Sequence, residues 1–206
     1  MRISLTKAGR RFNREWIFRN VNYQFEKGRS YAITGSNGSG KSTLLQVIAG
    51  VLATSEGNVE YTHNESQVSP ENFYQQLSLC APYLELIEEM TAIEFLAFHN
   101  DFKPFRQGMD PFAILEETGL GKSAHKQIRY FSSGMKQRMK LAQAIFVDLP
   151  VLLLDEPCTN LDEAGIVQYQ RWIRQFAADK LIIVSSNDPQ EYNFCTASLI
   201  MSDWKS

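Results

Sequence analysis

The sequence predicts an α/β protein built on a doubly wound, mainly parallel β-sheet, and two observations support this prediction. Residues 151–154 and 181–184 are uninterrupted aliphatic runs, which are typical of parallel strands that are covered on both faces. Stretches with helical spacing of apolar residues, at 135–146 and 165–178, alternate with these runs. Strands that alternate with helices need crossover connections, so a parallel sheet with helices on its faces is favoured.

Shorter patterns predict the remaining elements. Residues 29–34 are expected to form a strand and residues 41–50 a buried helix, with a glycine-rich loop between them. Residues 58–62 and 77–79 are expected to form strands of an antiparallel patch that pairs with the amino-terminal segment. Residues 91–125 show helical spacing without a strand pattern, which predicts a helical insertion.

Composition and charge bound the class of protein. Apolar residues make up 44% and charged residues 21% of the 206 residues, as in an ordinary globular protein. The net charge of -2 gives no general attraction for nucleic acid, which is therefore not an expected partner. The first 41 residues carry nine Lys or Arg against two Glu, which fits either a solvated face or a field that attracts a phosphate-bearing ligand.

The cysteines and the apolar runs indicate the compartment. Cys80, Cys158 and Cys195 are odd in number and widely spaced, which argues against a disulfide framework or a zinc site and favours a reducing compartment. Apolar runs stay well short of the ~18 residues that span a bilayer. We therefore expect a single cytoplasmic domain over residues 1–206.

A phosphate-binding loop is the strongest motif. Residues 35–42 read Gly-Ser-Asn-Gly-Ser-Gly-Lys-Ser, which satisfies G-x-x-x-x-G-K-[ST] between a strand and a helix. Glycines let successive N–H groups turn inward, and the positive end of the helix points at the same spot. Lys41 is predicted to hold the β and γ phosphates of a nucleotide, and Ser42 to ligate Mg²⁺. The residues expected to contact phosphate are Gly35, Ser36, Asn37, Gly38, Ser39, Gly40, Lys41, Ser42 and Thr43.

Two carboxylates follow the aliphatic run at 151–154. Asp155 and Glu156 should lie at the carboxyl edge of the sheet, where such folds bind ligands. Asp155 is predicted to hold Mg²⁺, directly or through water, and Glu156 to orient and deprotonate the water that attacks the γ-phosphate. A solvated strand end looks the same in isolation, but the phosphate loop in the same chain favours the site.

Three further segments complete a family pattern. Residues 131–138 read Phe-Ser-Ser-Gly-Met-Lys-Gln-Arg, residues 157–162 Pro-Cys-Thr-Asn-Leu-Asp, and residues 185–188 Ser-Ser-Asn-Asp. By their order and spacing the chain resembles the ATP-binding cassette (ABC) ATPase family over nearly its whole length. We name these segments after the family: signature segment, D-loop and switch segment. The resemblance implies a P-loop NTPase (RecA-like) core, a small antiparallel β subdomain, and a helical subdomain at about 85–140 that includes the signature segment.

The resemblance also implies roles for residues in the signature segment and D-loop. Ser132, Ser133 and Gly134 would grip the γ-phosphate bound to the opposite subunit, so that two nucleotides are sandwiched in a head-to-tail dimer. A serine helix cap is the structural alternative at 132 or 133. Asp162 stands at the aspartate of the D-loop.

An aromatic residue upstream of the phosphate loop usually stacks on adenine in this family. Phe12 stands nearest the expected place, with Trp16 as a rival. A core aromatic is an equally good interpretation of either residue.

The chain departs from the family at two positions that bear on mechanism. Asn187 occupies the switch position, where the family has histidine. An asparagine amide donates a hydrogen bond but carries no charge, so slow rather than absent hydrolysis is predicted. Tyr83 takes the slot of the family's glutamine, which puts in doubt the link between bound nucleotide and helical subdomain.

The function implied by the resemblance is that of the Mg-ATP-binding and ATP-hydrolysing subunit of an ABC transporter. Such a subunit powers a separately encoded membrane permease through ATP-driven dimerisation, as a homodimer or heterodimer. It would be peripheral at the inner face of the cell membrane. The alternatives are a soluble ABC-type ATPase and a slow-hydrolysing nucleotide switch that is not tied to transport.

Overall fold

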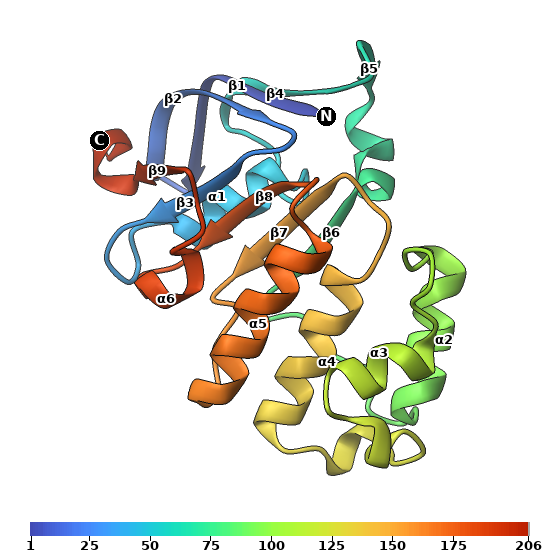
Figure 1. Ribbon diagram of the computed structural model, residues 1–206. Coiled ribbons are helices and arrows are strands. Elements are labelled where there is room, and N and C mark those ends of the chain that lie inside the picture. Colours follow the sequence, from blue (N-terminus) through green and yellow to red (C-terminus); the bar gives the residue numbers. More distant parts are fainter. Residues whose placement is uncertain (206) are drawn as a thin grey trace.

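The computed structural model describes residues 1–205 and contains two β-sheets with helices between and beneath them (Figure 1). The larger sheet has the strand order β6-β7-β8-β3-β9, and every neighbouring pair is parallel. The predicted doubly wound α/β class is confirmed. The strands of this parallel sheet are β3 (Ser30–Thr34), β6 (Leu77–Cys80), β7 (Val151–Asp155), β8 (Leu181–Ser185) and β9 (Ala197–Ile200).

The smaller sheet is antiparallel, with the order β2-β1-β4-β5. A long hairpin forms its edge, in which Arg2 pairs with Glu26 and Phe12 with Glu15. The expected pairing of residues 58–62 with the amino-terminal segment is confirmed, because β4 pairs with β1. The strands of the antiparallel sheet are β1 (Arg2–Phe12), β2 (Glu15–Glu26), β4 (Glu56–His63) and β5 (Ser66–Val68).

The prediction that residues 77–79 belong to the antiparallel patch was wrong. They form β6, the edge strand of the parallel sheet, where Leu77 lies opposite Val151 of β7. A strand of four residues carries a local pattern but no information about its partner, which here lies more than 70 residues further along the chain.

The helices begin at recognisable caps. Thr91 and Glu94 form a reciprocal capping box at the start of α2, and Asp110 caps α3 ahead of a proline. These two helices lie in the predicted insertion. The α-helices are α1 (Lys41–Ile48), α2 (Ala92–Phe102), α3 (Pro111–Glu117), α4 (Ser133–Ile145), α5 (Glu163–Phe176) and α6 (Pro189–Tyr192). The 3-10 segments are η1 (Pro70–Gln76), η2 (Gly121–Ser123), η3 (Ile128–Tyr130) and η4 (Met201–Trp204).

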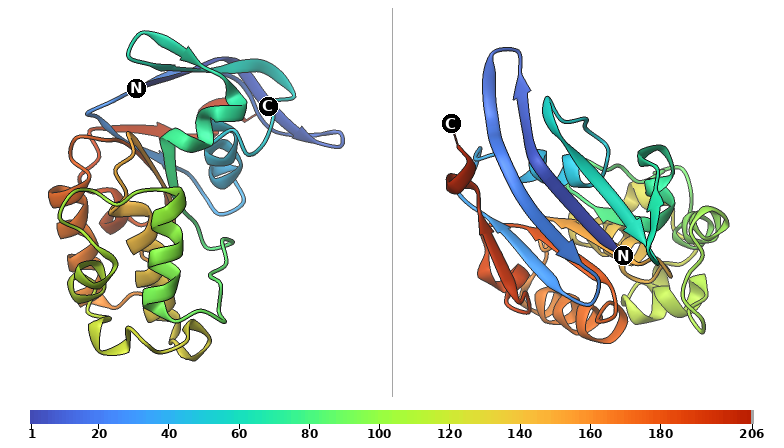
Figure 2. Two further views of the ribbon diagram at one scale, coloured as in Figure 1. Left: turned by 90° about the vertical axis from the view of Figure 1, so that its right-hand side faces the viewer. Right: turned by 90° about the horizontal axis from the view of Figure 1, so that it is seen from above.

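The parallel sheet is buried on both faces. In β7, Val151 and Leu153 pack with α1 and the antiparallel sheet, whereas Leu152 and Leu154 pack with α4 and α5. Figures 1 and 2 show this layering, with the antiparallel sheet and α1 on one side of the parallel sheet and α4 and α5 on the other. Double burial explains the continuous aliphatic runs. None of the helices within residues 1–205 is both long and apolar enough to cross a bilayer.

Candidate functional site

The phosphate loop, residues 35–42, joins β3 to α1 at the carboxyl edge of the parallel sheet. Its last glycine, Gly40, is the N-cap of α1 and has a left-handed backbone with φ of 99°. A Cβ on Gly40 would lie 2.4 Å from Cγ2 of Ile17, so glycine is required there. Because glycine has no side chain to accept the first-turn amides of α1, these N–H groups remain free to bind an anion.

A cavity of about 250 Å³ opens over this loop. It is lined by Ile17, by Glu156 and by residues 37–43. Ser39 points a buried hydroxyl into the loop, and that oxygen has no hydrogen-bond partner in the part of the chain that the structure describes. An unpartnered buried polar atom is rare, and at this place it is consistent with a polar ligand.

Lys41 is buried in the loop, with only 5% of its surface exposed. Its ammonium donates hydrogen bonds to the carbonyl oxygens of Gly35 at 2.9 Å and Ser36 at 3.3 Å. These contacts hold the positive charge at the base of the loop, where the predicted phosphate chain would lie.

Ser42 and Asp155 are brought together from two distant parts of the chain. The Ser42 hydroxyl donates a hydrogen bond to Oδ1 of Asp155 at 3.0 Å. Burial raises the pKa of the Asp155 carboxyl, and the hydrogen bond from Ser42 opposes this shift. A hydroxyl beside a buried carboxylate is a set of hard oxygen donors, which fits Mg²⁺.

Glu156 and Asn187 approach the loop from the ends of β7 and β8. Glu156 has a left-handed backbone with φ of 44°, and its amide donates to the carbonyl of Ser185 at 2.9 Å. The Asn187 side-chain amide donates to Oδ1 of Asn37 in the phosphate loop at 2.6 Å. The geometry thus brings the switch position into direct contact with the phosphate loop.

The signature segment and the D-loop each supply a helix cap. Oγ of Ser132 accepts from the amide of Met135 at 3.3 Å and caps α4, while Oδ1 of Asp162 accepts from Gly165 at 2.9 Å and caps α5. A Cβ on Gly134 would lie 3.1 Å from the carbonyl oxygen of Asn160, so the two segments touch through that glycine. Ser133, also on α4, is exposed.

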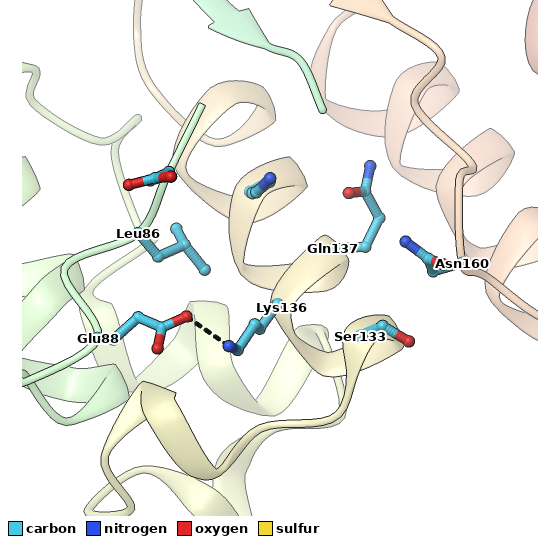
Figure 3. Close-up of a pocket in the computed structure, with 8 residues that line it drawn as sticks. Leu86, Glu88, Ser133, Lys136, Gln137 and Asn160 are labelled. Carbon is cyan, nitrogen blue, oxygen red and sulfur yellow. Dashed lines mark hydrogen bonds and ion pairs between the residues drawn. The ribbon is translucent and has the colours of Figure 1, made fainter. Parts of the chain in front are cut away.

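A second cavity of about 380 Å³ lies between α4 and the segment that follows β6 (Figure 3). Lys136 forms an ion pair with Glu88 across it, and Lys140 donates to the carbonyl of Pro82 at 2.8 Å. The helix of the signature segment is therefore tied to the segment that carries Tyr83. Burial raises the pKa of the Tyr83 hydroxyl, a hydrogen bond with Gln46 opposes this shift, and the negative charge of Asp155 adds to it.

The two aromatic candidates differ in how their rings are covered. Phe12 is 46% exposed and has the guanidinium of Arg10 over its ring at 4.8 Å. Two guanidinium groups lie over the ring of Trp16, that of Arg11 at 5.4 Å and that of Arg19 at 4.2 Å from the ring centroid. The ring of Phe12 therefore has the freer face for stacking.

Sequence reasoning missed two polar residues that contact the D-loop. Gln137 donates to the carbonyl of Pro157 at 2.6 Å, and Glu191 accepts from the amide of Cys158 at 2.7 Å. Gln137 stood inside the signature segment and could have been singled out from it. Glu191 lies in the four-residue helix α6, which has too little sequence to show a pattern.

A glycine loop at a helix N-terminus, with a serine and a buried aspartate converging beside it, defines a P-loop nucleotide-binding protein. A family model described as "ABC transporter" matches residues 18–159. The chain belongs to the ABC transporter family, in which it is an ATP-binding subunit.

Individual relatives agree with this assignment. The chain is 30% identical over 206 residues to the ABC transporter ATP-binding protein YybJ of Bacillus subtilis, with 97% of this chain and 91% of that protein covered. It is 31% identical over 181 residues to the cytochrome c biogenesis ATP-binding export protein CcmA of a Chelativorans species, covering 85% and 86%.

Solved structures share the fold. An ABC transporter ATP-binding protein from Pyrococcus furiosus superposes with a TM-score of 0.83 at 18% identity, over 100% of both chains. The cassette MJ0796, solved as a dimer in a post-hydrolysis state with ADP and Pi, gives 0.80 at 20% identity, over 96% of this chain and 93% of that one.

Proposed function

We propose that the chain binds Mg-ATP at the phosphate loop, pairs head-to-tail with a second cassette, and powers a separately encoded membrane permease. The observation that carries the proposal is the convergence of Lys41, Ser42 and Asp155 at one end of the parallel sheet. In this proposal the chain works as one unit, with residues 85–140 as its helical subdomain, peripheral at the inner face of the membrane.

The oxygens of Ser42 and Asp155 would hold the Mg²⁺ ion. When bound, this ion neutralises charge on the β and γ phosphates. Lys41 would move its ammonium from the loop carbonyls to those same phosphates. The amides at the start of α1 would donate to the remaining phosphate oxygens.

Glu156 would act as the general base, because it lines the cavity over the phosphate loop and follows the metal-binding Asp155. Asn187 would donate a hydrogen bond to the terminal phosphate from its place beside Asn37. Since this donor is neutral, hydrolysis would be slower than with a charged donor.

The partner cassette would meet the nucleotide through Ser132, Ser133 and Gly134, at the start of the 13-residue helix α4. A helix N-terminus favours an anion, and the exposed hydroxyls there suit phosphate. Asp162 would lie in the dimer interface with the D-loop. Support comes from the fold shared with the dimeric cassette MJ0796.

The test of the proposed function is Mg-dependent ATP hydrolysis, followed as phosphate release, together with ATP-dependent dimerisation in size-exclusion chromatography. A chain that binds ATP and dimerises without measurable release would instead be a nucleotide switch, which Asn187 also favours. Copurification with a polytopic membrane protein tests the proposed pairing with a permease. If no such protein copurifies and the chain still hydrolyses ATP, a soluble role would be favoured.

We expect Asn187→His to accelerate turnover about tenfold, because a charged donor forms a hydrogen bond roughly twice as strong as a neutral one. The gain should be full below the ordinary histidine pKa of about 6.5 and fade above it, since only the imidazolium carries the charge. The measurement is kcat against pH, with Asn187→Ala as the matched control that should turn over more slowly than the wild type. If Asn187→His has the same kcat as the wild type at every pH, the side chain at position 187 does not contact the terminal phosphate.

We expect Phe12→Ala to weaken ATP binding, because stacking a base on an aromatic ring contributes roughly 1–3 kcal/mol, or about 5- to 150-fold in affinity. Titration with a fluorescent ATP analogue measures the loss. Phe112→Ala is the control, since Phe112 is similarly exposed on α3 in the helical insertion. A loss with Trp16→Ala instead would assign the stacking role to the rival residue.

A further inference from the structure

One peptide bond of the D-loop is held from both sides by buried polar side chains. Nε2 of Gln137 donates to the carbonyl oxygen of Pro157 at 2.6 Å. The N–H of Cys158, on the other side of the same peptide unit, donates to Oε1 of Glu191 at 2.7 Å. Gln137 is 4% exposed and Glu191 5% exposed, so both side chains are largely shielded from water.

This peptide unit lies one residue beyond Glu156, which has an unfavourable backbone conformation. A left-handed φ of 44° is strained for a residue with a side chain, so neighbouring contacts must stabilise it. The carbonyl of Glu156 accepts from the amide of Thr159 at 3.2 Å and from its hydroxyl at 3.0 Å. These bonds close a turn over residues 156–159 whose central peptide is Pro157–Cys158, so the orientation of that peptide is coupled to the backbone of Glu156.

The two side chains come from elements that carry other parts of the site. Gln137 lies on α4, five residues after the signature segment's cap Ser132, and Figure 3 shows it projecting toward the segment with Asn160. Glu191 lies on α6, four residues after Asn187, and its backbone carbonyl accepts from the buried hydroxyl of Tyr169 at 2.9 Å. The contacts thus join the signature helix α4 and the helix α6, which directly follows the switch segment, at a single point of the D-loop.

Placing a carboxylate at this point is costly. Burial raises the pKa of Glu191, the hydrogen bonds from Ser186 and from the Cys158 amide oppose this shift, and the nearby carboxylates of Asp188 and Glu156 add to it. The side chain also borders the cavity of about 330 Å³ that contains Glu156 and Asn187. Perturbed acidic groups gather at functional sites, which agrees with a role beyond packing.

We propose that Gln137 and Glu191 are positioning residues for ATP hydrolysis, which clamp the Pro157–Cys158 peptide and thereby hold the general base Glu156 and the D-loop in place. This inference rests on the proposed role of Glu156. Neither residue lines the cavity over the phosphate loop, so their effect should fall on the chemical step rather than on binding.

The test uses substitutions that remove or keep each of the two contacts to the Pro157–Cys158 peptide. Gln137→Met removes the donor at nearly constant volume, Glu191→Ala removes the acceptor, and Glu191→Gln keeps an oxygen that can accept from Cys158. We expect Gln137→Met and Glu191→Ala to lower kcat by up to about 10²-fold with the ATP affinity unchanged, as for a catalytic group displaced by ~1 Å. Glu191→Gln should restore most of the rate.

The double variant gives an independent readout. Because both contacts act on one peptide unit, the combined loss in kcat should be much smaller than the product of the two single losses. Gln190→Ala, an exposed neighbour on α6, is the control and should leave kcat unchanged. Thermal unfolding of each variant verifies that it is folded; if Glu191→Ala does not fold, Gln137→Met and Glu191→Gln decide the question.

If Glu156→Gln is inactive while Gln137→Met and Glu191→Ala hydrolyse ATP at the wild-type rate, only the clamp is refuted. The clamp is also refuted if the variants lose ATP affinity rather than kcat, or if Glu191→Gln is as slow as Glu191→Ala. If Glu156→Gln keeps the wild-type rate, the general base itself is misassigned.

Discussion

Glu156→Gln is expected to lower kcat about 10²- to 10⁴-fold, the usual contribution of a positioned general base. Glutamine has the same shape and can still hydrogen-bond the attacking water, but it cannot take its proton. The substitution should leave ATP binding intact, because Glu156 borders the phosphate cavity without contributing to the contacts of Lys41 or Ser42.

Single-turnover phosphate release measures the rate of hydrolysis, and titration with a fluorescent ATP analogue measures the affinity for ATP. Glu163→Gln makes the same chemical change at an exposed position in the first turn of α5 and should leave both unchanged. The inactive variant should also accumulate as the ATP-bound dimer. A wild-type rate in Glu156→Gln would exclude this carboxylate as the base.

The sequence predicts most accurately those elements whose burial is uniform. β7 and β8 extend one residue beyond the aliphatic runs at 151–154 and 181–184, because both faces of each strand are covered by helices or by the other sheet. The phosphate loop is equally readable, because its chemistry depends on consecutive residues.

Features that depend on distant pairing were not readable in this way. β6 has the local pattern of a strand, yet only its contact with β7 decides that it runs parallel in the large sheet. Glu191 looks like any acidic residue in a short polar segment. Its importance emerges only when the fold brings it against Cys158, 33 residues earlier.

Likewise, the sequence placed Ser42 and Asp155 in two separate motifs, and topology joins them. Parallel strands β3 and β7 end at the same edge of the sheet, separated only by β8. Residues that follow these strands therefore converge, which is why ligands bind at this edge in open α/β sheets. Motif chemistry and sheet topology together predicted more of the site than either did alone.

Lys41→Ala should have the largest effect on ATP affinity. The ammonium would form charge-assisted hydrogen bonds with the β and γ phosphates, each worth roughly 1.5–3 kcal/mol. Losing two such bonds corresponds to a loss of about 10²- to 10⁴-fold in ATP affinity. The lower end is expected, because Lys41 already donates to the carbonyls of Gly35 and Ser36 and would exchange these partners for phosphate oxygens.

Titration with a fluorescent ATP analogue measures the affinity, and thermal unfolding without nucleotide shows whether the loop contacts also stabilise the fold. Lys122→Ala removes the same charge from an exposed position in η2 and is the matched control. Equal affinities for Lys41→Ala and the wild type would mean that the ammonium stays on the loop carbonyls when ATP binds. Recognition of the phosphates would then have to come from the amides at the start of α1.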